Sequence, residues 1–397
     1  MKDRVSYESQ VLYVGPSQTG TAGDFLISGL TPTQLHKIQR LESSLDVGSQ
    51  NVYQYGNINS LGRVVPDLID VSLEFEYPLA DAQNEKWLGF TLSNLETPAV
   101  SGLLSGIFDE QNYYILNKKR GDTYTTGDTQ FFLDENSGAN NLSVTSFGEC
   151  VIENYYIEAS LTDIPTATVA LNANNVTYAT GASEIDSPSI KGTGCRATGK
   201  VTIPAPKQSD LQVDALRPAS ITLNFGTHSL EGGGPVLPGN TEADNFSACS
   251  LESFLINLNL PRRINQRLGN RYPLSKPIIS NQAYVTMECL AKERDVVSGN
   301  LIDVFCSGAR DIQIDMDNPY NDSGNIKIGI KDAYLQTHAS ELSLVQNGMV
   351  NLEFQAPLVG GDVSSTGFYL SGVANTTQST TYGLTTTQLL ENDRNQR

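Results

Sequence analysis

The chain has 397 residues, of which only 18% are charged, yet its formal net charge is −18 and its pI lies near 4.5. This excess of carboxylates disfavours a protein that holds nucleic acid, because Lys and Arg are needed to displace phosphate counterions. The length exceeds that of one typical domain, so we expect two separate cores.

The cysteines and the N-terminus bound the class of protein further. The five cysteines are odd in number, form no CxxC pair and lie far apart, which predicts reduced, partly buried thiols. No apolar segment follows the first residues, and no apolar run approaches the ~18 residues that a membrane helix requires. We therefore expect a protein without a secretion signal, made in a cytoplasm and not inserted in a membrane.

Short alternating runs bounded by Gly, Pro, Asn and Asp recur along the chain, whereas helical periodicity is scarce. This pattern predicts antiparallel β structure. In the first run, Leu41, Ser43, Leu45 and Val47 would face inward. The uncharged, aromatic segment at residues 49–55 follows, which we call the first hook.

The next predicted strand, residues 70–77, divides its side chains by face. Alternation places the apolar side chains on one side and the polar ones on the other. The apolar set is Val71, Leu73, Phe75 and Tyr77, and the polar set is Asp70, Ser72, Glu74 and Glu76. A short helix is expected at residues 78–88, with Asp81 as its N-cap and Gly89 where it stops. Residues 101–130 resemble a long loop.

The second half of the chain repeats the order of the first. Residues 45–57 align without a gap onto residues 258–270, residues 71–75 match 285–289, and Ile152 matches Ile330. The repeated strands put Phe254, Ile256, Leu258 and Leu260 inward, and they place Val285, Met287 and Cys289 opposite Thr286 and Glu288. A weaker helix is expected at residues 290–305.

These patterns predict four segments. Residues 1–178 would form a first unit, residues 179–210 a linker, residues 211–372 a second unit and residues 373–397 a polar C-terminal arm. Residues 231–244 resemble a second long loop, of the kind that often serves binding or assembly.

No catalytic or metal-binding pattern stands out. Residues 194–200 approach a phosphate-binding loop, but Val201 stands where the magnesium-binding Ser or Thr belongs and the following prolines prevent a helix. The carboxylates around Asp315 do not match a calcium loop, and the three histidines are not at metal-ligand spacing. We expect no catalytic residue, no metal, no cofactor and therefore no enzyme.

The second hook carries a basic patch made of Arg262, Arg263, Arg267, Arg271 and Lys276. No glycine-aromatic pattern accompanies these residues, so nucleic-acid binding is not favoured. Pairing with carboxylates across a subunit interface fits better. The first hook, with Gln50, Tyr53 and Tyr55, would present a different surface to its neighbours.

The strand, polar hook, Pro66-centred turn, alternating strand at residues 70–77, and short helix containing Asn84 and Glu85 together resemble a bacteriophage tail tube (major tail) protein. The closing residues 154–160 and 164–167 resemble the paired strands that end such a domain. The resemblance covers about two thirds of the first half and, more weakly, half of the second.

The resemblance implies two tandem antiparallel β-sandwich or barrel-like units, each flanked by a short helix. Six such units would form a ring, so three chains would form a homotrimer with pseudo-sixfold symmetry, and rings would stack into a hollow tube. Asp70, Glu74, Glu76 and Glu288 would line the lumen and repel passing DNA, while the hooks would lie at subunit interfaces. The resemblance implies other tail proteins, such as terminator, baseplate and sheath proteins, as partners. It also implies that the protein is located in the virion tail, which is assembled in a bacterial cytoplasm.

Three alternatives remain at this stage. The acidic side chains could be ordinary solvent-facing residues of an antiparallel sheet. The chain could be a tail terminator, a baseplate component or a capsid-decorating protein, which shares short strands and polar loops. It could also be a carbohydrate-binding or receptor-binding module with an aromatic platform made of Tyr53, Tyr55, Tyr113 and Tyr114.

Overall fold

The computed structural model describes most of the predicted strands and leaves several connections undescribed. The described residues are 10–17, 32–55, 60, 62–64, 70–93, 95, 97–104, 109–118, 142–180, 185–190, 199–204, 216–227, 245–246, 251–268, 272–279, 282–292, 310–317, 325–341, 349–358 and 367–372. The predicted loop at residues 231–244, the arm at residues 373–397 and His228 lie outside these ranges.

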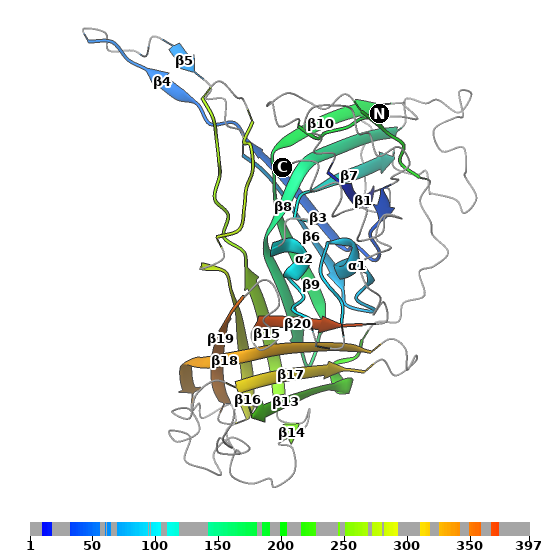
Figure 1. Ribbon diagram of the computed structural model, residues 1–397, viewed down its shortest axis with the longest axis vertical. Coiled ribbons are helices and arrows are strands. Elements are labelled where there is room, and N and C mark those ends of the chain that lie inside the picture. Colours follow the sequence, from blue (N-terminus) through cyan, green and yellow to red (C-terminus); the bar gives the residue numbers. More distant parts are fainter. Residues whose placement is uncertain are drawn as a thin grey trace.

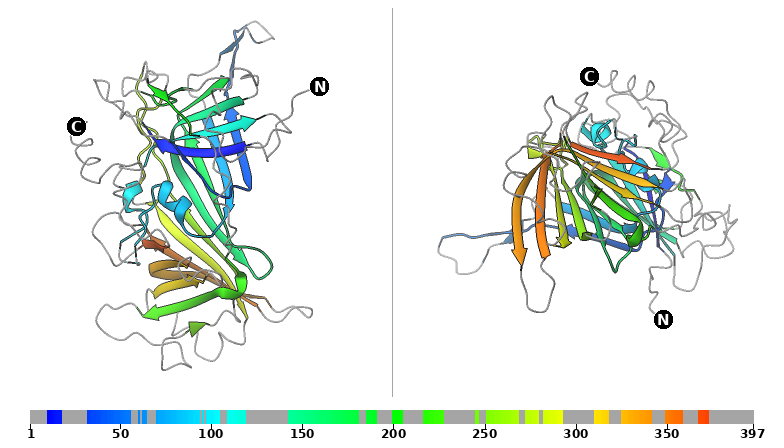
Figure 2. Two further views of the ribbon diagram at one scale, coloured as in Figure 1. Left: turned by 90° about the vertical axis from the view of Figure 1, so that its right-hand side faces the viewer. Right: turned by 90° about the horizontal axis from the view of Figure 1, so that it is seen from below.

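The molecule is mainly β, with antiparallel strands and very little helix, as the sequence predicts (Figure 1). Its described strands form one sixteen-stranded sheet and two small two-stranded sheets. The elongated body has its first half at one end and its second half at the other (Figures 1 and 2). Among the described residues, no helix is long and apolar enough to cross a membrane.

The first half contributes eight strands to the large sheet. β8 is the longest and bends, so that its two ends pair with different neighbours. The strands are β1 (Gln10–Pro16), β2 (Thr33–Gln34), β3 (Arg40–Asp46), β6 (Asp70–Pro78), β7 (Gln111–Lys118), β8 (Leu142–Ser160), β9 (Thr166–Ala173) and β10 (Asn175–Thr180).

The second half contributes another eight. Its long strand β18 also pairs with different neighbours along its length. The strands are β13 (Ile221–Thr227), β14 (Asn245–Phe246), β15 (Leu251–Asn259), β16 (Tyr284–Lys292), β17 (Arg310–Met316), β18 (Ile326–Glu341), β19 (Met349–Pro357) and β20 (Gly367–Ser371).

The two halves share one pairing order. In the first half the strands pair in the order β2-β1-β7-β8-β9-β6-β3, and β10 is added to β8; in the second the order is β14-β13-β17-β18-β19-β16-β15, and β20 is added to β18. The halves are joined where the end of β8 pairs with β15, with Asn154 opposite Asn259 and Ser160 opposite Ser253.

Irregularities in the ladders fix which residues correspond. The β8–β9 register shifts between Ile152 and Asn154, and the β18–β19 register shifts between Leu335 and Thr337. Ile152 therefore corresponds to Leu335, and the sequence-based match of Ile152 with Ile330 is wrong by five positions. Side-chain similarity alone does not count the residues that a bulge adds.

The predicted inward faces are confirmed for three strands but not for β3. Val71, Leu73, Phe75 and Tyr77 of β6 are buried. Also buried are Phe254, Ile256 and Leu258 of β15, Leu260 just after it, and Val285 and Met287 of β16. In β3, by contrast, Leu45 is 46% exposed, Val47 just beyond it is 44% exposed, and only Leu41 packs against the core. β3 pairs with β6 alone within the described structure, so its far edge and one face are open.

The core is also more continuous than expected. One buried cluster runs through both halves, from Leu12 to Leu370, across the β8–β15 joint, where two separate cores were predicted. A smaller cluster around Tyr13 and Tyr114 includes Ile185, Val201 and Ile203 from the predicted linker. Within that linker β11 (Ile185–Asp186) pairs with β12 (Lys200–Val201).

Helices and loops depart most from the sequence analysis. The first helix is only α1 (Gln83–Trp87), and its N-cap is Ala82, whereas Asp81 was predicted. Asp81 still accepts a hydrogen bond from the Gln83 N–H, and Gly89 follows the helix at a φ of 95°. Residues 290–292 continue strand β16, so the second helix does not begin where predicted. The predicted loop at residues 101–130 contains α2 (Ser101–Leu104) and strand β7. A 3₁₀ turn, η3 (Pro218–Ser220), precedes β13.

Candidate functional site

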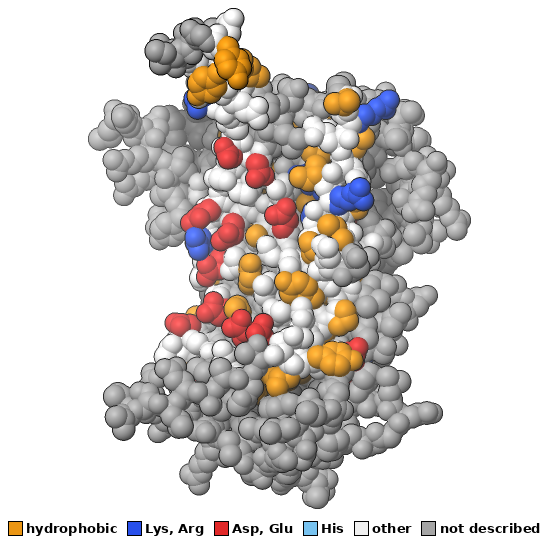
Figure 3. All heavy atoms as spheres, turned by 90° about the vertical axis from the view of Figure 1, so that its left-hand side faces the viewer, with side chains coloured by type: hydrophobic (Ala, Val, Ile, Leu, Met, Phe, Trp, Pro, Cys, Tyr) orange, Lys and Arg blue, Asp and Glu red, His pale blue; other side chains and the backbone are white. Residues whose placement is uncertain are grey.

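The most distinctive surface is the exposed face of an eight-stranded run, β3-β6-β9-β8-β15-β16-β19-β18, which crosses both halves. Strand register places side chains of opposing residues on one face. Carboxylates gather on this face (Figure 3). The described acidic side chains whose register positions share it are Glu42, Asp46, Asp70, Glu74, Glu76, Glu158, Glu288 and Glu353.

The acidic residues oppose one another across the strands. Glu42 lies opposite Glu74, Asp46 opposite Asp70, and Glu288 opposite Glu353. Like charges directly opposite destabilise a sheet, by roughly 0.2–1 kcal/mol for a pair. Arg40, opposite Glu76, supplies one compensating cation and also bonds Glu42 at 2.8 Å. Folding stability therefore does not account for this arrangement.

The sequence analysis identified half of this face. Asp70, Glu74, Glu76 and Glu288 all carry their side chains on the exposed side of the sheet, whereas Glu42, Asp46, Glu158 and Glu353 were missed. Glu353 stands at a polar position of an alternating strand, which is the signal that could have found it. Glu42 and Asp46 alternate with Leu41 and Leu45, so the same signal could have found them.

The two hooks form extended arms beside this face. Arm 1, residues 45–64, contains the hairpin β4 (Gln50–Val52) and β5 (Gly62–Val64) and projects beyond the body (Figure 1). Its described residues are all at least partly exposed, with Tyr53 at 66% and Tyr55 at 105%. Arm 2, residues 258–279, runs from β15 and is bridged between Arg262 and Ile278 and between Asn265 and Ser275.

Arm 2 is anchored to the first half of its own chain. The Arg262 guanidinium is 2% exposed, forms an ion pair with Asp109 at 2.6 Å and donates to the Ile152 carbonyl at 2.7 Å. Arg262 is thus committed to an internal contact, where pairing across a subunit interface was expected. Arg263 and Arg267 remain exposed and available to a neighbour. Arg271 lies outside the described residues.

A buried ionisable cluster surrounds this anchor and was not anticipated. Lys276 is 4% exposed and donates to the Asn172 side chain and to the Ala173 carbonyl. Burial lowers the pKa of Lys276, while nearby carboxylates oppose that shift. Burial, together with the charges of Glu149 and Asp109, raises the pKa of Glu110 to about 8. No sequence pattern connects these groups, because they come from distant segments.

A second buried carboxylate secures α1. Glu85 accepts hydrogen bonds from the hydroxyls of Tyr77 and Tyr155, each at 2.9 Å, and burial raises its pKa. Asn84 exchanges two 2.9 Å hydrogen bonds with the backbone of His36, whose ring stacks on Trp87. These hydrogen bonds and the ring stacking hold α1 against the segment around His36, so His36 has a structural role.

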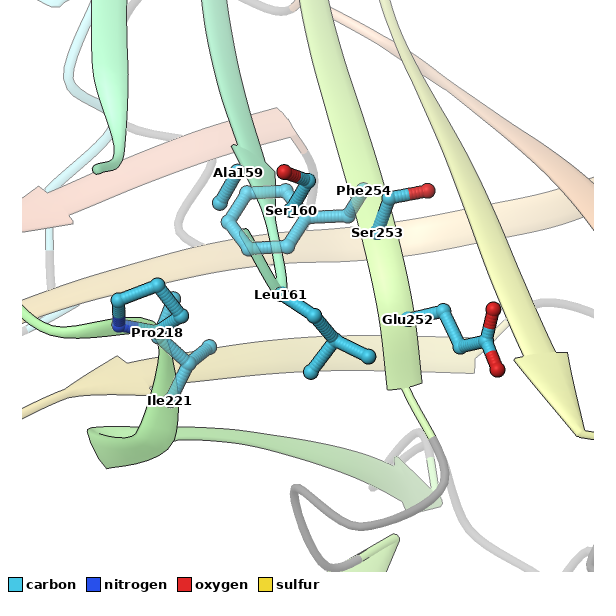
Figure 4. A pocket seen from close by; sticks show the side chains of 8 residues that line it. All are labelled: Ala159, Ser160, Leu161, Pro218, Ile221, Glu252, Ser253 and Phe254. Atoms are coloured by element: carbon cyan, nitrogen blue, oxygen red, sulfur yellow. The ribbon is translucent and has the colours of Figure 1, made fainter. Parts of the chain in front are cut away.

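The described residues form a shallow hollow at the joint between the two halves. This open hollow lies where β8 meets β15, between Leu161, Pro218, Ile221 and Phe254, and Glu252 is its one ionisable lining residue (Figure 4). No group of His, Cys, Asp or Glu side chains within the described ranges is arranged to hold a metal. Tyr113 and Tyr114 are 1% exposed, so they cannot join Tyr53 and Tyr55 in a sugar-binding platform.

Comparison with known proteins gave matches among solved structures only. No family model and no curated protein matches the chain. One match is the tail of an empty GTA particle, refined with C6 symmetry, at 11% sequence identity and a TM-score of 0.22. The alignment covers 42% of this chain and 98% of the matched chain. Another match is the six-fold symmetrised baseplate of the anti-feeding prophage, at 10% sequence identity and a TM-score of 0.26; the alignment covers 45% of this chain and 97% of the matched chain. TM-scores this low leave the function to be inferred from the chain itself.

Proposed function

We propose that the protein is a structural subunit of a phage-like tail, which assembles into rings that stack as a hollow conduit for DNA. The carrying observation is the acidic sheet face with its opposed like charges. A wall of carboxylates repels the phosphate backbone and lets DNA pass without binding. The three opposed carboxylate pairs disfavour folding, so a role in repelling DNA from the lumen wall would explain why the chain has them.

The shared pairing order supports two tandem tube units in one chain. Under this proposal residues 1–178 and 211–372 are repeats of one unit, residues 179–210 connect them and residues 373–397 form a terminal arm. The helix that flanks the first unit is α1. Three chains then supply six units, which gives a homotrimeric ring with pseudo-sixfold symmetry.

The open strand edges support closure into a ring. Inside the chain, β8 of the first half pairs with β15 of the second. By the same correspondence β18 presents an equivalent edge at residues 337–341, and β3 is equivalent to β15. Pairing β18 of one copy with β3 of the next would remove both open edges and continue the acidic face around the ring.

The proposal extends to partners and place. Terminator, baseplate and sheath proteins are the expected neighbours, DNA is cargo without specific contacts, and the assembled protein belongs to the virion tail after assembly in a bacterial cytoplasm. The role is structural, without catalysis or cofactor. A baseplate, terminator or capsid-decorating protein is the second candidate, since such a protein shares the β architecture but stops at one ring or binds a shell.

Negative-stain electron microscopy of the purified protein over a concentration series tests the proposal. Hollow rings or tubes with three-fold or six-fold appearance are expected in axial views. Single rings that never stack would favour the second candidate, and monomers at every concentration would contradict the proposed ring-forming subunit. In assembled particles, Glu74→Lys with Glu76→Lys should leave assembly intact but slow DNA ejection; unchanged ejection would remove the lumen assignment.

A further inference from the structure

We infer that arm 1 of one copy docks onto the second half of a neighbouring copy in the same ring, as arm 2 docks onto the first half of its own chain. This inference rests on the proposed ring and names a specific contact within it. The partner is therefore a second copy of this chain. Four observations carry the inference.

The two arms are built alike. In arm 1, Gln50 pairs with Val64 and Val52 with Gly62. In arm 2, the Arg263 N–H donates to the Pro277 carbonyl at 3.0 Å, and Asn265 is bridged to Ser275. Both arms leave the ladder at the same point, because β3–β6 corresponds to β15–β16. Arg63 of arm 1 thus takes the place of Lys276 in arm 2.

The base of arm 2 is held by hydrogen bonds to three backbone carbonyls of the first half, one donated by a backbone N–H and two by side chains. The Leu260 N–H donates to the Glu153 carbonyl at 2.8 Å, and Arg262 donates to the Ile152 carbonyl. Lys276 reaches the end of β9 at Asn172 and the Ala173 carbonyl. These contacts extend the β8–β15 ladder into the base of the arm, where Leu258 and Leu260 are buried.

In arm 1, the residues equivalent to Leu258 and Leu260 are not buried by another described part of the chain. Leu45 is 46% exposed where its equivalent Leu258 is 0% exposed, and Val47 is 44% exposed where Leu260 is 0% exposed. Exposed apolar side chains at positions that the sister half buries indicate a missing partner. Figure 1 shows the consequence, since β4 and β5 extend away from the body.

The second half carries the matching surface. Leu335 and Gln336 correspond to Ile152 and Glu153, while Gln355 and Ala356 correspond to Asn172 and Ala173. Tyr334 is 48% exposed on this surface, whereas its equivalent Val151 is 0% exposed. Arg63 would then donate to the Gln355 side chain and the Ala356 carbonyl, as Lys276 does at the internal joint. Asp332 stands where Glu149 does and supplies a nearby carboxylate.

The two joints differ in one respect that matters for assembly. Ser49 replaces Arg262, so the joint between copies lacks the buried ion pair with Asp109. Losing a charge-assisted, multiply bonded guanidinium weakens a contact. The joint between copies is therefore more easily reversed than the joint inside a chain, which lets an incorrectly closed ring reopen.

Cysteine cross-linking on the full chain distinguishes this inference from the ring itself. Asp46→Cys with Thr337→Cys reports edge pairing through a disulfide, since the internal joint places their equivalents, Asn259 and Asn154, opposite each other. Val64→Cys with Gln336→Cys, joined by a short bis-maleimide, reports arm docking and leaves Arg63 and its acceptors unchanged. Tyr178→Cys with Gln336→Cys is the control, because Tyr178 is 71% exposed on β10, outside both arms, and the unmodified chain gives the background of its native cysteines.

Cross-linked species no larger than trimers are expected for both reporter pairs and none for the control. Arg63→Ala should abolish the arm cross-link and raise the critical assembly concentration about tenfold, as loss of a charge-assisted contact implies, whereas Lys200→Ala, which removes an exposed cation on β12, should not. Edge cross-links without arm cross-links would overturn this inference and leave the ring standing. Absence of both would overturn the ring as well.

Discussion

Glu149 and Asp332 occupy the same place in the two halves of the sheet. Each is a non-glycine residue with positive φ, 51° and 62°, next to a ladder irregularity. The Glu149 N–H donates to Asn112 Oδ1 at 3.0 Å and the Asp332 N–H donates to Asp311 Oδ1 at 3.1 Å. Strained backbone held by an equivalent side chain in both halves is difficult to explain by chance. It supports a repeated unit more strongly than any sequence match does.

The first prediction concerns this cap. Asn112→Ala should lower the free energy of unfolding by about 2–3 kcal/mol, because it leaves the buried Glu149 N–H without its acceptor. Asn112 is 0% exposed and also donates to Ser189 Oγ at 2.8 Å. Urea unfolding measures the loss. Asn51→Ala on exposed arm 1 is the control and should change stability by less than about 0.5 kcal/mol; equal effects would contradict the role of the cap.

The second prediction concerns pH and Glu110. Its pKa rises from 4.5 to about 8 in the folded chain, so the folded chain binds this proton more tightly than the unfolded chain does. The stability that the protonated group contributes is therefore complete below pH 4.5 and is lost as the pH rises through about 8. Glu110→Gln should be more stable than the unmodified chain at pH 8.5, by on the order of 2 kcal/mol, with little difference at pH 4.

Unfolding curves at a series of pH values measure this effect. Glu158→Gln removes a carboxylate from the exposed sheet face that has no like charge opposite it, and serves as the control. If the stability of Glu110→Gln runs parallel to that of the unmodified chain from pH 4 to pH 8.5, the Glu110 carboxyl does not titrate as proposed.

The third prediction concerns the anchor of arm 2. Arg262→Met should destabilise the chain by about 3–5 kcal/mol, because Asp109 would be left as an uncompensated buried charge. The double variant Arg262→Met with Asp109→Leu should recover most of that loss, since both charges are then removed. Thermal and denaturant unfolding of the four chains of this cycle gives the coupling energy. A coupling near zero would mean that the ion pair does not hold the arm, which is then held by its other contacts to the first half.

The sequence predicts the strands whose two faces differ. Residues 70–77 alternate strictly, and residues 253–259 alternate except at Leu255; their inward residues, such as Phe75 and Ile256, are buried as predicted. It does not predict strand β7, because Tyr113, Tyr114, Ile115 and Leu116 are all buried and give no alternation. It also assigns Leu45 to the interior, because alternation shows that a strand has two faces but not whether another part of the chain covers one of them.

The candidate site was predictable only in part. Alternation on β6 and β16 placed Asp70, Glu74 and Glu288 on the exposed face. It could not show that Glu74 lies opposite Glu42, because register depends on pairing across the chain. The commitment of Arg262 to Asp109 was hidden for the same reason, since 153 residues separate them.

The last prediction separates the electrostatic role of the acidic face from its structural role. Glu74→Gln removes the repulsion with Glu42 directly opposite, so it should raise the free energy of unfolding of the isolated chain by about 0.2–1 kcal/mol at low salt. The gain should shrink as salt screens the pair. Glu158→Gln is the control, because Glu158 lies opposite Thr166 and Leu255 and has no like-charged residue across either strand. If Glu74→Gln stabilises the isolated chain but slows DNA ejection from assembled particles, these carboxylates are retained for DNA passage at a cost in folding stability. If Glu74→Gln destabilises the chain, the carboxylates have an ordinary structural role.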